Sequence, residues 1–75
     1  MPRITEMYAF VAEESGPGDE GIVAMKVANS WMPLVGADMK RAASLRRMAV
    51  SIARVSGKKI RLVRFTNRED LEEIE

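Results

Sequence analysis

Apolar and polar residues alternate imperfectly along residues 4–12, ITEMYAFVA, where aromatic and β-branched types are frequent. This pattern is typical of a strand that packs on one face and is partly covered on the other. Residues 22–28, IVAMKVA, predict a second strand, and the Gly- and Pro-containing segment ESGPGDEG before it predicts the connecting turn. Residues 58–65, KKIRLVRF, predict a third strand.

From residue 39 to residue 56 the apolar positions follow the period of an α-helix. Asp38 is a suitable N-cap for this helix, and Gly57 stands where a helix often ends with a residue at positive φ. The apolar stripe comprises Ala42, Leu45, Met48, Ala49, Ile52 and Val55. The opposite arc is narrow and polar, and holds Lys40, Ser44, Arg47, Ser51 and Arg54.

Residues 66–75 predict a short C-terminal helix or tail, because Thr66 and Glu69 have capping-box spacing and Leu71 and Ile74 share one side. Residues 29–38, which contain Pro33, predict an irregular connection. The chain is therefore expected to form a single α+β domain over residues 1–75. Its predicted order is β-β-α-β, with a three-stranded, mostly antiparallel sheet and the main helix on one face.

The sequence excludes much chemistry because it contains no Cys and no His. It offers no disulfide, no thiolate or imidazole metal ligand, no Cys nucleophile and no His general base. GPGDEG lacks the Lys-Ser/Thr ending of a phosphate-binding loop, and neighbouring surface acids such as Asp19 and Glu20 seldom form a specific metal site. We expect no catalytic residue, no metal and no cofactor, and therefore no enzyme.

The small size of the chain predicts association, since 75 residues without disulfides or metals bury a modest core. We expect a homodimer or a higher homo-oligomer. The small side chains of Ala42, Ala49 and Ala53 would let another helix approach, which makes them the predicted oligomer interface. The alternative is that alanine is simply a good helix former.

Charge is segregated along the chain although its formal net value is only +1. Residues 1–39 carry two cations and six anions, residues 40–68 carry ten cations and no anion, and residues 69–75 carry five anions. The basic block predicts binding to nucleic acid or another acidic partner. The candidate contact residues are Lys40, Arg47, Arg54, Lys58 and Arg61.

Two observations limit this prediction. Alternate residues of a strand point to opposite faces, so Arg61 and Arg64 cannot contribute to one patch. The C-terminal acids could also fold back over the basic residues and cancel their field.

Trp31, in NSWMPL, is the only tryptophan. It is interpreted either as a residue that seals the edge of the core or, with Met32, as an anchor for a protein partner. We therefore expect a non-catalytic binding or regulatory module that associates with nucleic acid. The alternatives are a protein-binding inhibitor or adaptor acting through the Trp31 loop and an oligomeric structural protein.

No motif in the chain identifies a family, although its size and element order are similar to those of small phage and mobile-element proteins. No apolar run approaches the roughly 20 residues of a membrane-spanning helix. The first residues, MPRITEMYAF, lack the pattern of a signal peptide. We expect a cytoplasmic protein without membrane contact.

Overall fold

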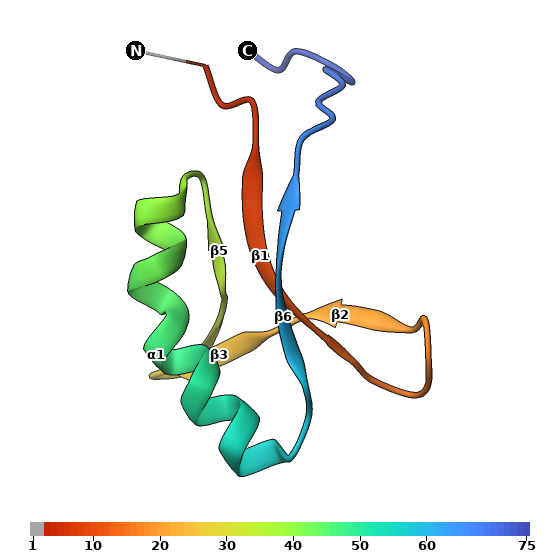
Figure 1. The fold of residues 1–75 in the computed structure, drawn as a ribbon. Helices are drawn as coiled ribbons and strands as arrows, with labels where there is room; N and C mark the ends of the chain where they lie inside the picture. Colours follow the sequence, from red (N-terminus) through yellow and green to blue (C-terminus); the bar gives the residue numbers. More distant parts are fainter. Residues whose placement is uncertain (1–2) are drawn as a thin grey trace.

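Strand β1 runs through the centre of the structure, a computed structural model that describes residues 3–75 (Figure 1). The described elements are β1 (Met7–Glu13), β2 (Glu20–Ile22), β3 (Ala24–Val27), β4 (Ser30–Pro33), β5 (Val35–Gly36), α1 (Met39–Ser56) and β6 (Ile60–Phe65). All pairings are antiparallel. The predicted α+β class with one main helix is confirmed.

Both edges of β1 are occupied. Along one edge it pairs with β6, in register from Met7↔Phe65 to Ala12↔Ile60. Along the other edge it pairs first with β5 and then with β2, where Val11 lies opposite Ile22. The consecutive residues Tyr8 to Val11 are buried, so β1 is covered on both faces, in agreement with the imperfect alternation of its sequence.

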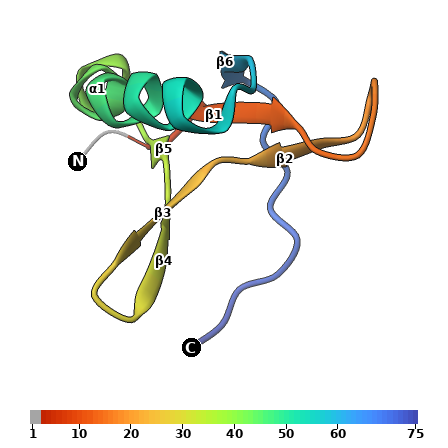
Figure 2. The same cartoon turned by 90° about the horizontal axis from the view of Figure 1, so that it is seen from below.

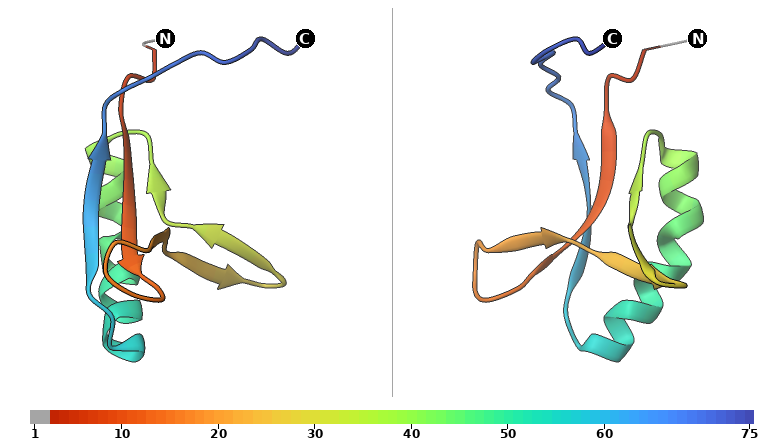
Figure 3. Two further views of the ribbon diagram at one scale, coloured as in Figure 1. Left: turned by 90° about the vertical axis from the view of Figure 1, so that its right-hand side faces the viewer. Right: turned by 180° about the vertical axis from the view of Figure 1, so that it is seen from behind.

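Strands β3 and β4 form a separate hairpin that projects from the sheet (Figure 3). The direction of this hairpin is set at a junction of three segments. Here β1 meets Val23, which lies between β2 and β3, and Leu34, which lies between β4 and β5. The N–H of Phe10 donates to the carbonyl of Leu34 at 3.1 Å, that of Val23 to Phe10 at 2.8 Å, and that of Leu34 to Val23 at 2.8 Å. The side chains of the same three residues form the core cluster with Ala49 of α1.

Helix α1 begins and ends where its sequence predicts. The side chain of Asp38 accepts a hydrogen bond from the N–H of Arg41 at 2.8 Å. Gly57 has φ 73° and donates its N–H to Ala53 at 2.9 Å. A residue with a Cβ would be strained in this left-handed conformation, which explains the glycine.

The stripe of small residues on α1 packs inside the chain. Ala42 is 0% exposed and Ala49 is 4% exposed. Both residues let α1 approach the sheet of its own chain. Ala53 is half-buried. Association between copies, and a part for these residues in it, stays a prediction.

Two details of the predicted architecture are wrong, because residues 22–28 are two strands that bend at Val23 and residues 29–38 include β4 and β5. Of the two forms predicted for residues 66–75, a short helix or a tail, the structure shows the tail. Pro33 fits within β4 because hydrogen-bonded and non-bonded pairs alternate in an antiparallel ladder. The bond from Leu34 to Val23 leaves Pro33 at a position where no N–H is needed.

Gly36 of β5 lies close against the first turn of α1. A Cβ at this position would lie 2.9 Å from the backbone nitrogen of Ala42. We expect Gly36→Ala to lower the free energy of unfolding by about 1–3 kcal/mol, because backbone must move to relieve the clash. Gly16→Ala is the matched control, since its Cβ meets nothing within 4 Å. Urea denaturation of both variants measures the difference, and equal stabilities would contradict this packing.

Candidate binding surfaces

Helix α1 presents a line of cations to solvent. It carries Lys40, Arg41, Arg46, Arg47 and Arg54 and no acidic residue. Lys40, Arg47 and Arg54 are spaced by seven residues, which is close to two helical turns, so they lie along one edge about 10 Å apart. All three are exposed.

The acids of the described residues do not neutralise this line. Within residues 3–75 the ion pairs involve Arg3, Arg41, Arg61 and Arg68, and none reaches Lys40, Arg47 or Arg54. The tail leaves β6 and runs away from α1 (Figure 2). The field of the helix cations is therefore not cancelled by residues 69–75 through direct pairing.

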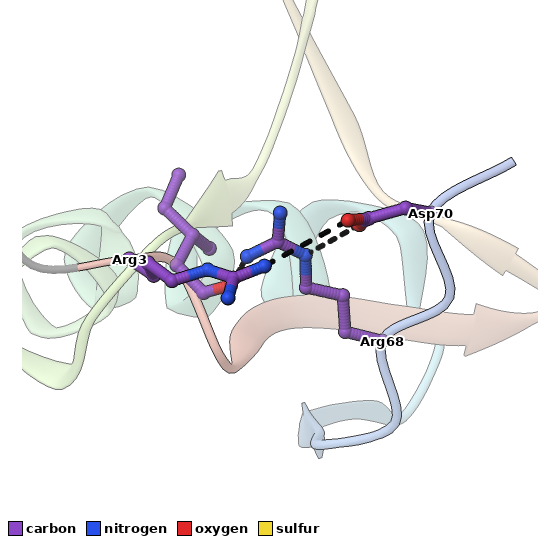
Figure 4. A network of polar contacts seen from close by, with 4 residues as sticks. Arg3, Arg68 and Asp70 are labelled. Atoms are coloured by element: carbon purple, nitrogen blue, oxygen red, sulfur yellow. Dashed lines mark hydrogen bonds and ion pairs between the residues drawn. The ribbon is translucent and has the colours of Figure 1, made fainter. Parts of the chain in front are cut away.

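The start of the tail is attached to the N-terminal segment instead. Asp70 pairs with Arg68 at 2.8 Å and with Arg3 at 3.7 Å (Figure 4). Arg68 also donates to the carbonyl of Ile4 at 3.1 Å. These contacts join the start of the tail to the segment before β1.

Arg61, also a predicted contact residue, is separated from the helix cations. It lies opposite Val11 in the β1–β6 ladder, whereas Leu62 and Phe10 occupy the face that packs on α1. Arg61 pairs with Glu13 at 3.9 Å and with Glu20 at 3.7 Å. These side chains line a cavity of about 290 Å³ together with Val11, Ala12, Lys58 and Lys59. Of the five predicted contacts, Lys40, Arg47 and Arg54 thus form one surface, and Lys58 and Arg61 belong to another.

The hairpin carries the second surface. Trp31 lies on β4 opposite Lys26 and is 68% exposed, and Met32 is 38% exposed. The interpretation of Trp31 as a core seal is therefore wrong, because the hairpin carries it beyond the sheet. Its prediction as a partner contact is untested, but the exposure that such a contact requires is present. Sequence reasoning missed the strand that displays it.

A hollow of about 400 Å³ separates Trp31 from the end of α1 and the start of β6. Its lining includes Ala24, Ile52, Ser56, Lys58 and Ile60. Ile52 and Arg54 are two residues apart, and successive helix residues are rotated by about 100°. The hollow and the line of cations therefore lie on different sides of α1.

Neither a family model nor a curated protein nor a solved structure matches this chain. In the part of the chain that the structure describes, no three His, Cys, Asp or Glu side chains are grouped to hold a metal ion. No helix in residues 3–75 is long and apolar enough to span a membrane.

The exposure of Trp31 has a measurable consequence for stability. We expect Trp31→Ala to change the free energy of unfolding by less than about 1 kcal/mol, because the side chain fills no core space. Leu34→Ala should cost about 2–5 kcal/mol, since Leu34 is 0% exposed. Guanidinium denaturation of the two variants provides the comparison. If Trp31→Ala lowered the free energy of unfolding as much as Leu34→Ala does, Trp31 would have to pack in the core.

Proposed function

We propose that this chain is a non-catalytic module that binds nucleic acid through the exposed face of α1. The observation that supports the proposal is the acid-free helix whose line of cations, Lys40, Arg47 and Arg54, is not paired with any acid of residues 3–75. Such a line attracts phosphates and gains free energy from the release of counterions.

The dimensions of the line suit a duplex. Lys40 and Arg54 are fourteen residues apart, or about 21 Å along the helix, which matches about six base pairs. Asp38 caps the N-terminus of α1, so its carboxylate disfavours a phosphate at the helix end. Contact therefore runs along the side of α1, with phosphates rather than base edges as its main targets, and it carries little sequence preference.

This proposal predicts a defined dependence on salt. With three phosphate contacts, affinity for a short duplex should fall roughly 40-fold between about 50 mM and about 200 mM salt, since each contact contributes a slope of about −0.9. Arg47→Gln/Arg54→Gln should reduce the magnitude of that slope by about 1.8 and weaken binding at low salt. Fluorescence anisotropy of labelled DNA and RNA, single- and double-stranded, measures both quantities.

A matched control is available on the other face of the sheet. Lys59→Gln/Arg61→Gln removes the same net charge but lies beside Glu13 and Glu20. We expect it to leave most of the slope intact. Equal reductions of the salt slope in the two double variants would show that binding depends only on the net charge of the chain. Absence of binding by the wild-type chain at low salt would refute the proposal.

A second candidate function, recognition of a protein partner, rests on the exposure of Trp31. Tryptophan and methionine are common in the centres of protein interfaces. A projecting hairpin that carries Trp31 and Met32 beside a hollow is a suitable adaptor or inhibitor surface. Because this surface and the line of cations lie on different sides of α1, one chain has room for both partners. A cytoplasmic location stays a prediction.

The two functions respond to different substitutions. Binding of a protein partner, captured on immobilised full-length chain and measured by calorimetry, should be lost in Trp31→Ala and retained in Arg47→Gln/Arg54→Gln. It should also depend weakly on salt. The reverse ranking would place the protein partner on α1 and leave the hairpin without this role.

A further inference from the structure

Residues 66–75, TNREDLEEIE, have the pattern of an amphipathic helix but no surface to pack on. They contain no helix in the structure, and Leu71 and Ile74 are 83% and 82% exposed. A segment this short is not a stable helix in water unless its apolar side packs against something. The tail therefore has the sequence pattern of an amphipathic helix, but in its own chain it packs on no surface that would stabilise that helix.

A groove between α1 and β6 provides an unoccupied apolar surface. Its volume is about 200 Å³. Its apolar lining comprises Phe10, Ala49, Val50, Ala53, Ile60 and Leu62. Leu62 is 41% exposed, and β6 pairs with β1 alone among the described strands. No element of residues 3–75 continues the sheet beyond β6 and covers the groove.

The charges beside the groove are opposite to those of the tail. Arg46 lines the groove, and Arg64 follows Leu62 on the same face of β6. Arg47 and Arg54 are three and four residues from Val50, on the same side of α1. Within residues 3–75, none of these four arginines forms an ion pair. Residues 69–75 carry five anions around Leu71 and Ile74.

The tail is directed away from the groove of its own chain. Arg68 donates to the carbonyl of Ile4, and Asp70 pairs with Arg3 and Arg68, so the start of the tail is held against the segment before β1 (Figure 4). From there the tail extends further from the helix (Figure 2). Reaching its own groove would require these contacts to break.

We propose that the tail of one copy docks as a short helix in the α1–β6 groove of a second copy. Leu71 and Ile74 insert beside Leu62 and Val50, and the surrounding acids meet the arginines of the groove. The contact joins two different surfaces, so it forms once in a heterologous dimer and twice where two copies exchange tails reciprocally. It goes beyond nucleic-acid binding and competes with it, because both use Arg47 and Arg54.

Two full-length variants separate the two halves of this contact. Leu71→Ser/Ile74→Ser disables the tail but leaves the groove, and Arg46→Glu disables the groove but leaves the tail. In sedimentation velocity at about 50 mM salt, the wild-type chain should show a mass that rises with concentration and falls at high salt, where charges are screened. Each variant alone should remain monomeric. Circular dichroism of the wild-type chain should show helical signal rising with concentration.

Mixing the two variants is the decisive step. The tail of Arg46→Glu and the groove of Leu71→Ser/Ile74→Ser are intact, so the mixture should form a 1:1 complex that neither variant forms with itself. A monomeric wild-type chain, self-association retained by either variant, or a mixture that stays monomeric would each overturn the proposal. DNA affinity at low protein concentration should be unchanged in Leu71→Ser/Ile74→Ser, so failure of the tail contact is distinguishable from failure of nucleic-acid binding.

Discussion

A closed ring of three backbone hydrogen bonds joins Phe10, Val23 and Leu34, and each residue donates once and accepts once. Strands leave this junction in different directions, yet the ring satisfies polar groups that would otherwise be buried without partners. The three side chains are also the centre of the core with Ala49. The junction therefore fixes two things together: the depth at which α1 sits on the sheet and the direction in which the β3–β4 hairpin projects.

The separation of surfaces follows from this geometry. One side of α1 borders the groove and the line of cations, and the other borders the hollow beneath Trp31. The tail departs from the far end of β6, so its five acids lie apart from the cations of α1 (Figures 1 and 2). A formal net charge of +1 thus conceals a molecule with distinct basic and acidic regions.

Helix-capping residues and apolar runs in the sequence were enough to predict α1, β1 and β6. Asp38 and Gly57 mark the ends of α1, and the apolar runs of β1 and β6 mark the long strands. The short strands could not be predicted, because the bend at Val23 and the pairing of β4 arise from contacts between distant residues. The helical period of the sequence also placed Lys40, Arg47 and Arg54 on a polar arc, and all three are exposed in the structure. The sequence could not show that Arg61 faces the other side, because that depends on the register with Val11.

Nucleic-acid binding along α1 is the central claim, and amide chemical-shift mapping by NMR tests it most directly. The full-length chain would be titrated at low salt with a short duplex of mixed sequence. The account predicts perturbations along residues 40–54, with little change in the hairpin, residues 24–33, or around Arg61. Perturbations confined to the hairpin or to the cavity beside Arg61, or no perturbation at all, would contradict it.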